Sequence, residues 1–464
     1  MVVTASSLPE AKVFQVLELS FSENVSMKNR SMLDDVSPGT MNNSKQDKGT
    51  VFENPQIVRG PYLQQGTESG IIIRWATTSP AQGRVWYGTD PNRLSLTLEE
   101  ATITRSHKVE LGGLTPDTKY YYSVGTKHGS TVGGSEDYFF VTAPSIDLAP
   151  SLVRPMRIWV VGDSGRANDD AALVRDGYLK FTGTRHTDLW LMLGDNAYET
   201  GTFDEYQHAV FNMYPHLLRS SVLWTAIGNH DAGSASSLKQ TGPYYELFNL
   251  PTRGEAGGVA SGTAAYYSFD YGNIHFICLD SYGSDRSPKS AMFTWLAHDA
   301  ASSDKDWKIA FWHHPPYTKG SHDSDIETEL VEMRERALPI IEDAGVDIVL
   351  GGHSHSYERS YLIDGHYGVS DSFTSDMKKD AGSGRECESG PYQKRHAASH
   401  EGTVYIVAGT SALADRVSPH AAMHTSLSIP GSLVLDVHGK RLDVRFIDAH
   451  GEVKDYFTLK KTTP

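Results

Sequence analysis

Five short apolar runs in the chain each end in side chains that bind metal ions. The run at residues 191–193 is followed by a glycine and then by Asp195 and Tyr198. The other four runs end in the following residues: Asp163; Asn229, His230 and Asp231; His313 and His314; His353 and His355. Carboxylate, imidazole and amide oxygen groups are common ligands of metal ions. The residue types therefore indicate metal-assisted chemistry.

The spacing of these runs predicts that their ends meet. Each run is rich in β-branched or aromatic residues, which is typical of a buried strand. Asp163 and Asp195 are 32 residues apart, and Asp195 and Asn229 are 34 apart. A strand-crossover-strand unit needs about 30 residues or more. Because open α/β sheets bind ligands at the carboxyl ends of their strands, we expect a two-metal site there.

Tyr198 discriminates between the metals that could bind. A single aspartate after a glycine is more often a turn or a helix cap, but five such endings together favour a metal centre. A phenol has an ordinary pKa near 10, so it becomes a ligand only where a strong Lewis acid displaces its proton. Trivalent iron would do so, whereas magnesium or calcium would not. The alternative is that Tyr198 is only a packed aromatic side chain.

Composition limits the class of protein. The chain has 464 residues, enough for two or more domains. It contains 42 Lys and Arg against 57 Asp and Glu, and the net charge of −15 argues against nucleic acid as a partner. No run of 18 apolar residues occurs, so no membrane span is expected. The N-terminus lacks the features of a secretory signal, and two cysteines form no disulfide framework.

The chain divides into regions of different pattern. Residues 1–54 are polar and predict a flexible tail, and residues 146–155 predict a linker. Short strand-like runs at residues 55–145 predict an all-β sandwich, and the strand of Trp75 with the turn at 114–116 resembles fibronectin type III modules. From residue 156 to 464 strands alternate with helical patterns, which is typical of an α/β domain. Helices are expected at 169–181, 203–218, 291–301 and 325–344. Residues 364–402 are a long polar insertion.

The motifs together resemble those of the purple acid phosphatases, within the calcineurin-like metallophosphoesterase superfamily. The matching motifs are Gly162-Asp-Ser-Gly165, Gly194-Asp-Asn-Ala-Tyr198, Gly228-Asn-His-Asp231, His313-His-Pro-Pro-Tyr317 and Gly352-His-Ser-His-Ser-Tyr-Glu-Arg359. The wider superfamily has Asp-x-His in the first motif, whereas this chain has Gly165 there and Tyr198 in the second motif. The resemblance covers about residues 55–450. It implies a metallophosphoesterase βαβ sandwich preceded by the all-β domain.

The resemblance also implies a role for each residue. Those expected to hold Fe(III) are Asp163, Tyr198 and His355. Those expected to hold a divalent metal (Zn, Fe or Mn) are Asn229, His313 and His353. Asp195 would bridge the two ions, and His230 and His322 would contact phosphate and assist the leaving group. The chain departs from the commoner pattern at Asp231, at His314 and in the long insertion. We expect the first two to alter the tuning of the metal site and the third to alter substrate choice.

The implied function is hydrolysis of small phosphate monoesters at acidic pH. Two cations about 3.5–4 Å apart can activate a bound water as hydroxide and clamp the phosphoryl group for in-line transfer to water. An imidazolium donor is lost as the pH rises through about 6–7, hence the acidic optimum. The family habit implies a secreted or periplasmic protein. Two alternatives remain: a phosphodiesterase or nucleotide pyrophosphatase that uses the same metals, and a non-catalytic binding protein.

Overall fold

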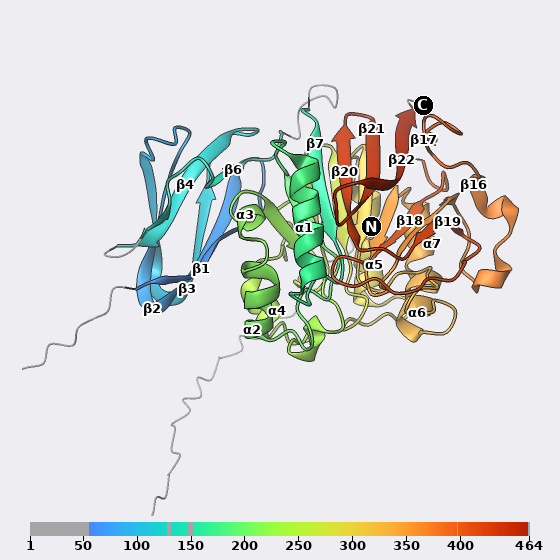
Figure 1. Cartoon of the computed structure of the whole chain (residues 1–464), viewed down its shortest axis with the longest axis horizontal. Helices are drawn as coiled ribbons and strands as arrows, with labels where there is room; N and C mark the ends of the chain where they lie inside the picture. Colours follow the sequence, from blue (N-terminus) through green and yellow to red (C-terminus); the bar gives the residue numbers. More distant parts are fainter. Residues whose placement is uncertain (1–54, 128–130, 146–152, 397, 463–464) are drawn as a thin grey trace, which may run out of the picture. The chain divides into compact units, whose positions relative to one another are not determined.

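The computed structural model describes residues 55–462, apart from 128–130, 146–152 and 397 (Figure 1). The predicted tail at residues 1–54 and most of the predicted linker lie outside the described residues. Within the described part, no helix is both long and apolar enough to cross a membrane.

The first region is all β, as the sequence predicts. Its strands are β1 Ile57–Gln64, β2 Gly70–Gly88, β3 Leu96–Gly112, β4 Lys119–Thr126, β5 Val132–Gly133 and β6 Phe139–Val141. Trp75 is only 1 % exposed and stacks on His107 with ring centroids 4.8 Å apart, so it is a core residue as expected. Two runs that the sequence separates form one strand, β2, which keeps its pairing with β3 through register shifts between Ala76 and Arg84.

Strand β1 joins this region to the rest of the protein. It pairs antiparallel with β2 and also makes a parallel bridge to β9 between Leu63 and Val222. The hydroxyl of Tyr62 and the guanidinium of Arg74 both donate to the carbonyl of Leu247. The two regions therefore share one hydrogen-bonded sheet, and the domain boundary at 146–155 stays a prediction.

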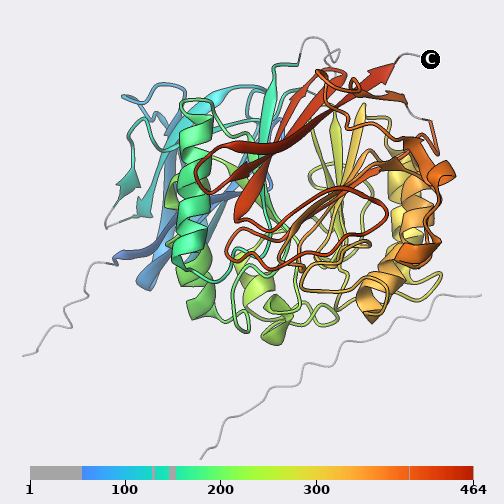
Figure 2. The same cartoon turned by 45° about the vertical axis from the view of Figure 1, so that its right-hand side comes forward.

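The second region contains two mixed sheets. Its strands are β7 Met156–Val161, β8 Leu189–Met192, β9 Val222–Thr225, β10 Tyr267–Tyr271, β11 Ile274–Cys278, β12 Trp307–Phe311, β13 Ile348–Gly351, β14 Tyr357–Ser360, β15 Leu362–Ile363, β16 Lys378–Asp380, β17 Tyr392–Arg395, β18 Val404–Ala408, β19 Met423–Leu427, β20 Gly431–His438, β21 Arg441–Asp448 and β22 Val453–Thr462. One sheet runs β17-β22-β21-β20-β7-β8-β9 before it continues into β1, and the other runs β10-β11-β12-β13-β18-β14-β19. In Figure 2 the red strands β20 to β22 and the yellow strands β10 to β12 lie in different layers.

A continuous apolar core fills the space between these two sheets. Val160 and Leu191 from one sheet and Phe311, Leu350 and Ile406 from the other belong to the same buried cluster. Alternate residues of the second sheet belong to a different cluster, on its other face. Because successive side chains of a strand point to opposite faces, strands covered on both sides read as unbroken apolar runs.

Helices cover the outer faces of the sheets. They are α1 Asp169–Thr182, α2 Phe203–Tyr206, α3 Pro215–Leu218, α4 Pro243–Leu247, α5 Ala291–Ser302, α6 Thr328–Arg336 and α7 Leu338–Asp343, with a π-helical turn at Gln207–Phe211 and 3-10 turns at Asp231–Gly233, Ser370–Ser372 and Ser375–Met377. Helix α1 lies against β20 and β21 (Figure 1). Helices α5 to α7 supply apolar residues to the second cluster.

Two predicted helices are confirmed and two are broken. Helices α1 and α5 match the predictions for 169–181 and 291–301 to within a residue. The pattern at 203–218 forms α2, a π-helical turn and α3, since Pro215 has no N–H to donate and begins a new helix. The pattern at 325–344 is split into α6 and α7, again with a proline in the first turn of the second helix.

The insertion at residues 364–402 is folded onto the domain. Strand β16 pairs with β15, and β17 pairs parallel with β22. The Ser370 hydroxyl donates to Asp325, and the His366 ring stacks on Tyr317. The insertion therefore packs against the 317–325 segment that follows the candidate ligand His313.

An ion pair buried beside the second sheet predicts a large loss of stability on substitution. Arg359 of β14 donates from Nε to Asp455 of β22 at 2.6 Å, and both side chains have no exposure. Asp455→Asn should lower the free energy of unfolding at pH 7 by about 3–5 kcal/mol, because a buried guanidinium loses its counter-charge. Urea denaturation would measure this, and an unchanged urea midpoint would contradict it. The matched change Glu452→Gln, at an exposed ion pair with Lys454, should leave the midpoint unchanged.

The same ion pair predicts how the stability difference between wild type and Asp455→Asn depends on pH. Burial alone would raise the pKa of Asp455, but the hydrogen bonds and charge of Arg359 outweigh it and hold the pKa below its ordinary value. Its contribution to stability is therefore present above an unfolded pKa of about 3.9 and is lost as the pH falls through the lower folded value. The difference between wild type and Asp455→Asn should shrink below about pH 4.

Candidate metal centre

The candidate ligands follow the carboxyl ends of strands from both sheets. Asp163, Asp195 and Asn229 follow β7, β8 and β9, whose last residues lie side by side in parallel register. His313 and His353 follow β12 and β13, which are paired in the same way. The sequence predicted that all of these ligands meet at one edge of a single sheet. That prediction is wrong for the histidines, because β12 and β13 belong to the facing sheet.

Glycines before the ligands make the close approach possible. A Cβ on Gly194 would lie 2.5 Å from Nδ1 of His313, and a Cβ on Gly228 would lie 2.2 Å from Oδ1 of Asp195. Asp163, Asp195 and His353 themselves have positive φ angles of 56°, 51° and 65°. Such angles are uncommon for residues other than glycine and gather at functional sites. The backbone conformation at the strand ends therefore directs these side chains toward one another.

Three side chains form a first group with ligand-like spacing. The Tyr198 hydroxyl lies 3.2 Å from Oδ1 of Asp163 and 3.4 Å from Nε2 of His355. Nε2 of His355 lies 3.7 Å from the same Asp163 oxygen. Ligands about 2.0–2.2 Å from one cation lie about 3.0–3.8 Å from each other. These three atoms could therefore hold one ion.

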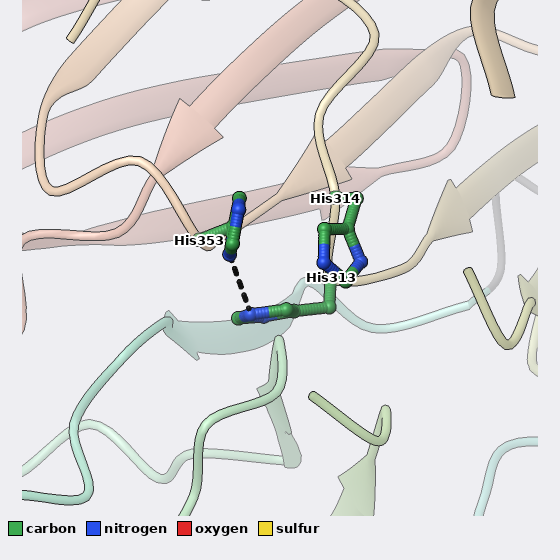
Figure 3. Close-up of side chains that lie close together, drawn as sticks. All are labelled: His313, His314 and His353. Carbon is green, nitrogen blue, oxygen red and sulfur yellow. Dashed lines mark hydrogen bonds between the residues drawn. The ribbon is translucent and has the colours of Figure 1, made fainter. Parts of the chain in front are cut away.

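A second group surrounds Nε2 of His313. That nitrogen lies 3.0 Å from Oδ1 of Asn229, 3.3 Å from Nδ1 of His353 and 3.4 Å from Oδ2 of Asp195. Figure 3 shows the contact between the His353 and His313 rings as a dashed line. The spacing again fits ligands of one cation, and the mixture of imidazole, amide and carboxylate suits a divalent transition metal.

Asp195 lies between the two groups. Its carboxylate is 2 % exposed, contacts His313 on one side and interacts with the Tyr198 hydroxyl on the other. Burial alone would raise its pKa, but the charges and hydrogen bonds of His313 and His230 hold it well below the ordinary value. An ionised carboxylate in this position could bridge two cations.

The electrostatic environment of the Tyr198 phenol means that only a strong Lewis acid could bind it. Burial raises the pKa of the Tyr198 phenol far above 10, and the Asp163 and Asp195 carboxylates raise it further. The phenol therefore keeps its proton unless a highly charged cation replaces it. In the second group, burial lowers the pKa of His353 to about 3, so its ring is neutral and offers a lone pair.

Both predicted outer histidines lie beside these groups. His230 donates from Nδ1 to the carbonyl of Glu199 at 2.7 Å, which leaves Nε2 directed toward Asp195, 3.9 Å away. The His322 ring stacks on His353 with centroids 3.7 Å apart, and its Nδ1 lies 2.8 Å from the Glu327 carboxylate. In each ring one nitrogen is fixed by an acceptor, so the other is available to a bound substrate.

Three acidic residues support the site, and sequence patterns did not assign two of them, Asp415 and Glu327, to it. Asp415 accepts from Nδ1 of His355 at 2.9 Å, and Glu327 contacts both His322 and His353. Asp231 accepts from the backbone N–H groups of Asn196 and Gly228, which fixes the turn before Asn229. Asp415 and Glu327 follow no apolar run, so only the folded structure reveals them; Asp231 adjoins Asn229 and His230 in the sequence.

Comparison with known proteins finds a matching family for each of the two regions. Residues 59–142 match the purple acid phosphatase N-terminal domain, and residues 156–357 match the calcineurin-like phosphoesterase family. The chain is 30 % identical to purple acid phosphatase 23 of Arabidopsis thaliana over 357 residues, covering 65 % of this chain and 74 % of that protein. It is 31 % identical to purple acid phosphatase 15 of the same plant over 284 residues, covering 55 % and 50 %. It is 27 % identical to a phosphoenolpyruvate phosphatase of Allium cepa, covering 67 % and 64 %.

The alignments therefore span between half and three quarters of these curated relatives. Among solved structures, a purple acid phosphatase from yellow lupin (Lupinus luteus) seeds superposes with a TM-score of 0.62 at 17 % identity, covering 87 % of this chain and 75 % of that one. The structure of PhoD gives 0.57 at 14 % identity, covering 86 % and 90 %. At these identities the structural matches show a shared fold.

Removal of the Asp415 carboxylate should weaken metal binding. Asp415→Asn leaves the His355 ring in place but removes the charge that orients its Nδ1–H, and such partners affect metal affinity by about 10–100-fold. We expect about 10-fold, since the Asp415 side chain is 44 % exposed and screened by water. Chelator competition with elemental analysis would measure the change. Asp304→Asn, at an exposed aspartate before the opposite end of β12, is the control and should bind metal as the wild type does.

Proposed function

Since the chain belongs to the purple acid phosphatases, we propose that it hydrolyses small phosphate monoesters at acidic pH at a centre of two metal ions. The observation that carries the proposal is the pair of ligand groups that share Asp195. Their spacing fits two cations, and a binding protein without catalysis has no need of such an arrangement. The metals that we propose are Fe(III) and a divalent ion, either Zn, Fe or Mn.

The proposed ligands divide as follows. Asp163, Tyr198 and His355 hold Fe(III); Asn229, His313 and His353 hold the divalent ion; Asp195 bridges the two. The raised pKa of the Tyr198 phenol supports a trivalent ion in the first position, because a weaker Lewis acid would leave the phenol protonated. The neutral His353 and the amide of Asn229 support a divalent ion in the second.

The chemistry divides between the metals and the histidines. When bound, the two ions would supply an activated water and positive charge for the phosphoryl oxygens. Either His230 or His322, each anchored through Nδ1, would donate one proton from Nε2 to the departing alkoxide, and the other would contact the phosphate. The acidic optimum that we propose predicts that activity falls as the pH rises above about 7. A rate that still rises at pH 9 would argue against it.

The proposed partner is a small phosphate ester, with neither nucleic acid nor membrane involved. The net charge of −15 disfavours polyanions in general. We also propose that the protein acts outside the cytoplasm, secreted or periplasmic, in an acidic medium. Cell fractionation tests this, and detection only in the cytoplasm would contradict it.

Turnover of two related substrates separates a monoesterase from a diesterase. We expect kcat/KM for p-nitrophenyl phosphate to exceed that for bis-p-nitrophenyl phosphate by at least about 100-fold, since a doubly charged phosphoryl group gains more from two cations. Both rates are measured at pH 5 on the same metal-loaded sample. A preference for the diester would favour a phosphodiesterase or nucleotide pyrophosphatase that uses the same ligands.

The visible spectrum tests the assignment of Tyr198. Wild-type protein should be purple and contain about one iron and one further metal per chain, because a phenolate bound to Fe(III) absorbs visible light. Tyr198→Phe should lose the band while it stays folded, and Tyr121→Phe in the first region should keep it. A colourless wild type with two divalent ions would remove Tyr198 from the ligand set.

A further inference from the structure

His314 is a third histidine at the divalent position, and no proposed ligand role uses it. It follows His313 at the end of β12 and is 2 % exposed. One nitrogen of its ring lies within 4.8 Å of one nitrogen of His313 and one nitrogen of His353. Figure 3 shows the three rings gathered around one point, with a nitrogen of His314 on the side of its ring that faces His353.

Ser281 determines which nitrogen of this ring carries the proton. The Ser281 hydroxyl accepts the backbone N–H of His314 at 3.0 Å and lies 2.9 Å from Nδ1 of the same residue. Among the described residues, the hydroxyl hydrogen has only that Nδ1 as an acceptor. This arrangement favours a hydroxyl that donates to Nδ1, which leaves the proton of the neutral ring on Nε2.

The ring is held rigidly in this orientation. Tyr282 stacks on it with an interplanar angle of 14° and ring centroids 5.8 Å apart. Asp280 accepts the backbone N–H groups of Tyr282 and Gly283, which fixes the turn that carries Ser281. A donor fixed in advance loses little entropy when it binds an anion.

Nε2 of His314 is therefore unsuited to be a ligand and suited to be a donor. A nitrogen that carries a proton has no lone pair to offer a cation. Within the described part of the chain, no hydrogen bond joins Nε2 to another residue, although the ring is almost fully buried. One nitrogen from each of the His313, His314 and His353 rings lies within 4.8 Å of the other two, so an N–H group of His314 is close enough to reach an oxygen bound at the cation.

We propose that His314 is a substrate-binding residue that donates its Nε2–H to a phosphate oxygen held at the divalent position. This rests on the proposed phosphatase function and adds a third histidine donor to His230 and His322. Ser281 is its positioning residue, because its hydroxyl places the proton on Nε2.

The dissociation constant of inorganic phosphate for the metal-loaded protein tests this contact. His314→Phe keeps a flat ring without the donor and should raise that constant about 10- to 100-fold, the range expected for a hydrogen bond to a charged group. Elemental analysis should still find two metals per chain. His314→Gln, whose amide N–H replaces the donor, should stay within about threefold of the wild type. His298→Gln, on the exposed face of α5, is the control and should bind phosphate normally.

A second variant tests the proton assignment. Ser281→Ala should weaken phosphate binding about 2- to 10-fold, since the ring can then place its proton on either nitrogen. This variant also serves if His314→Phe does not fold. Unchanged phosphate affinity in either folded variant would overturn the proposal, as would loss of the divalent ion from His314→Phe, which would make His314 a ligand. A wild type that binds no metal would instead refute the proposed function.

Discussion

The buried carboxylate of Asp195 is the constraint on which the rest of the site depends. It has almost no exposure, and water therefore cannot stabilise its charge. Contacts with His313, His230 and the Tyr198 phenol surround it instead, and they come from three separate segments of the chain. To bring these segments within reach, two sheets must face each other with their strand ends aligned. The sandwich architecture thus provides the surroundings that this one carboxylate requires.

Sequence patterns succeeded where the signal is local. An apolar run, a glycine and a ligand lie within ten residues of each other, and each part has its own physical reason: burial, close approach and coordination. Asp163, Asp195 and Asn229 could be predicted to meet because the register of neighbouring parallel strands follows from short crossovers. His230 and His322 were expected at the site by resemblance, and both rings lie there with one nitrogen fixed by an acceptor.

Patterns failed where the contact depends on tertiary structure. Asp415 and His355 are 60 residues apart, and nothing near Asp415 distinguishes it from other loop aspartates. The bridge between β1 and β9 could not be predicted either, because a single pair of residues 159 positions apart produces no periodic pattern in the sequence. The helical pattern at 203–218 was read as one element although Pro215 restarts the helix, which shows that composition alone overstates helix length.

The bridge between β1 and β9 has a consequence for biosynthesis. A ribosome adds about 5–20 residues per second, so Val222 emerges on the order of 10–30 s after Leu63. During that interval the free edge of β1 can pair with another chain, as unpaired strand edges do. The first region is therefore exposed to misassembly until the second begins to fold. Slower translation between them would lengthen that period, whereas chaperones that cover the edge would shorten it.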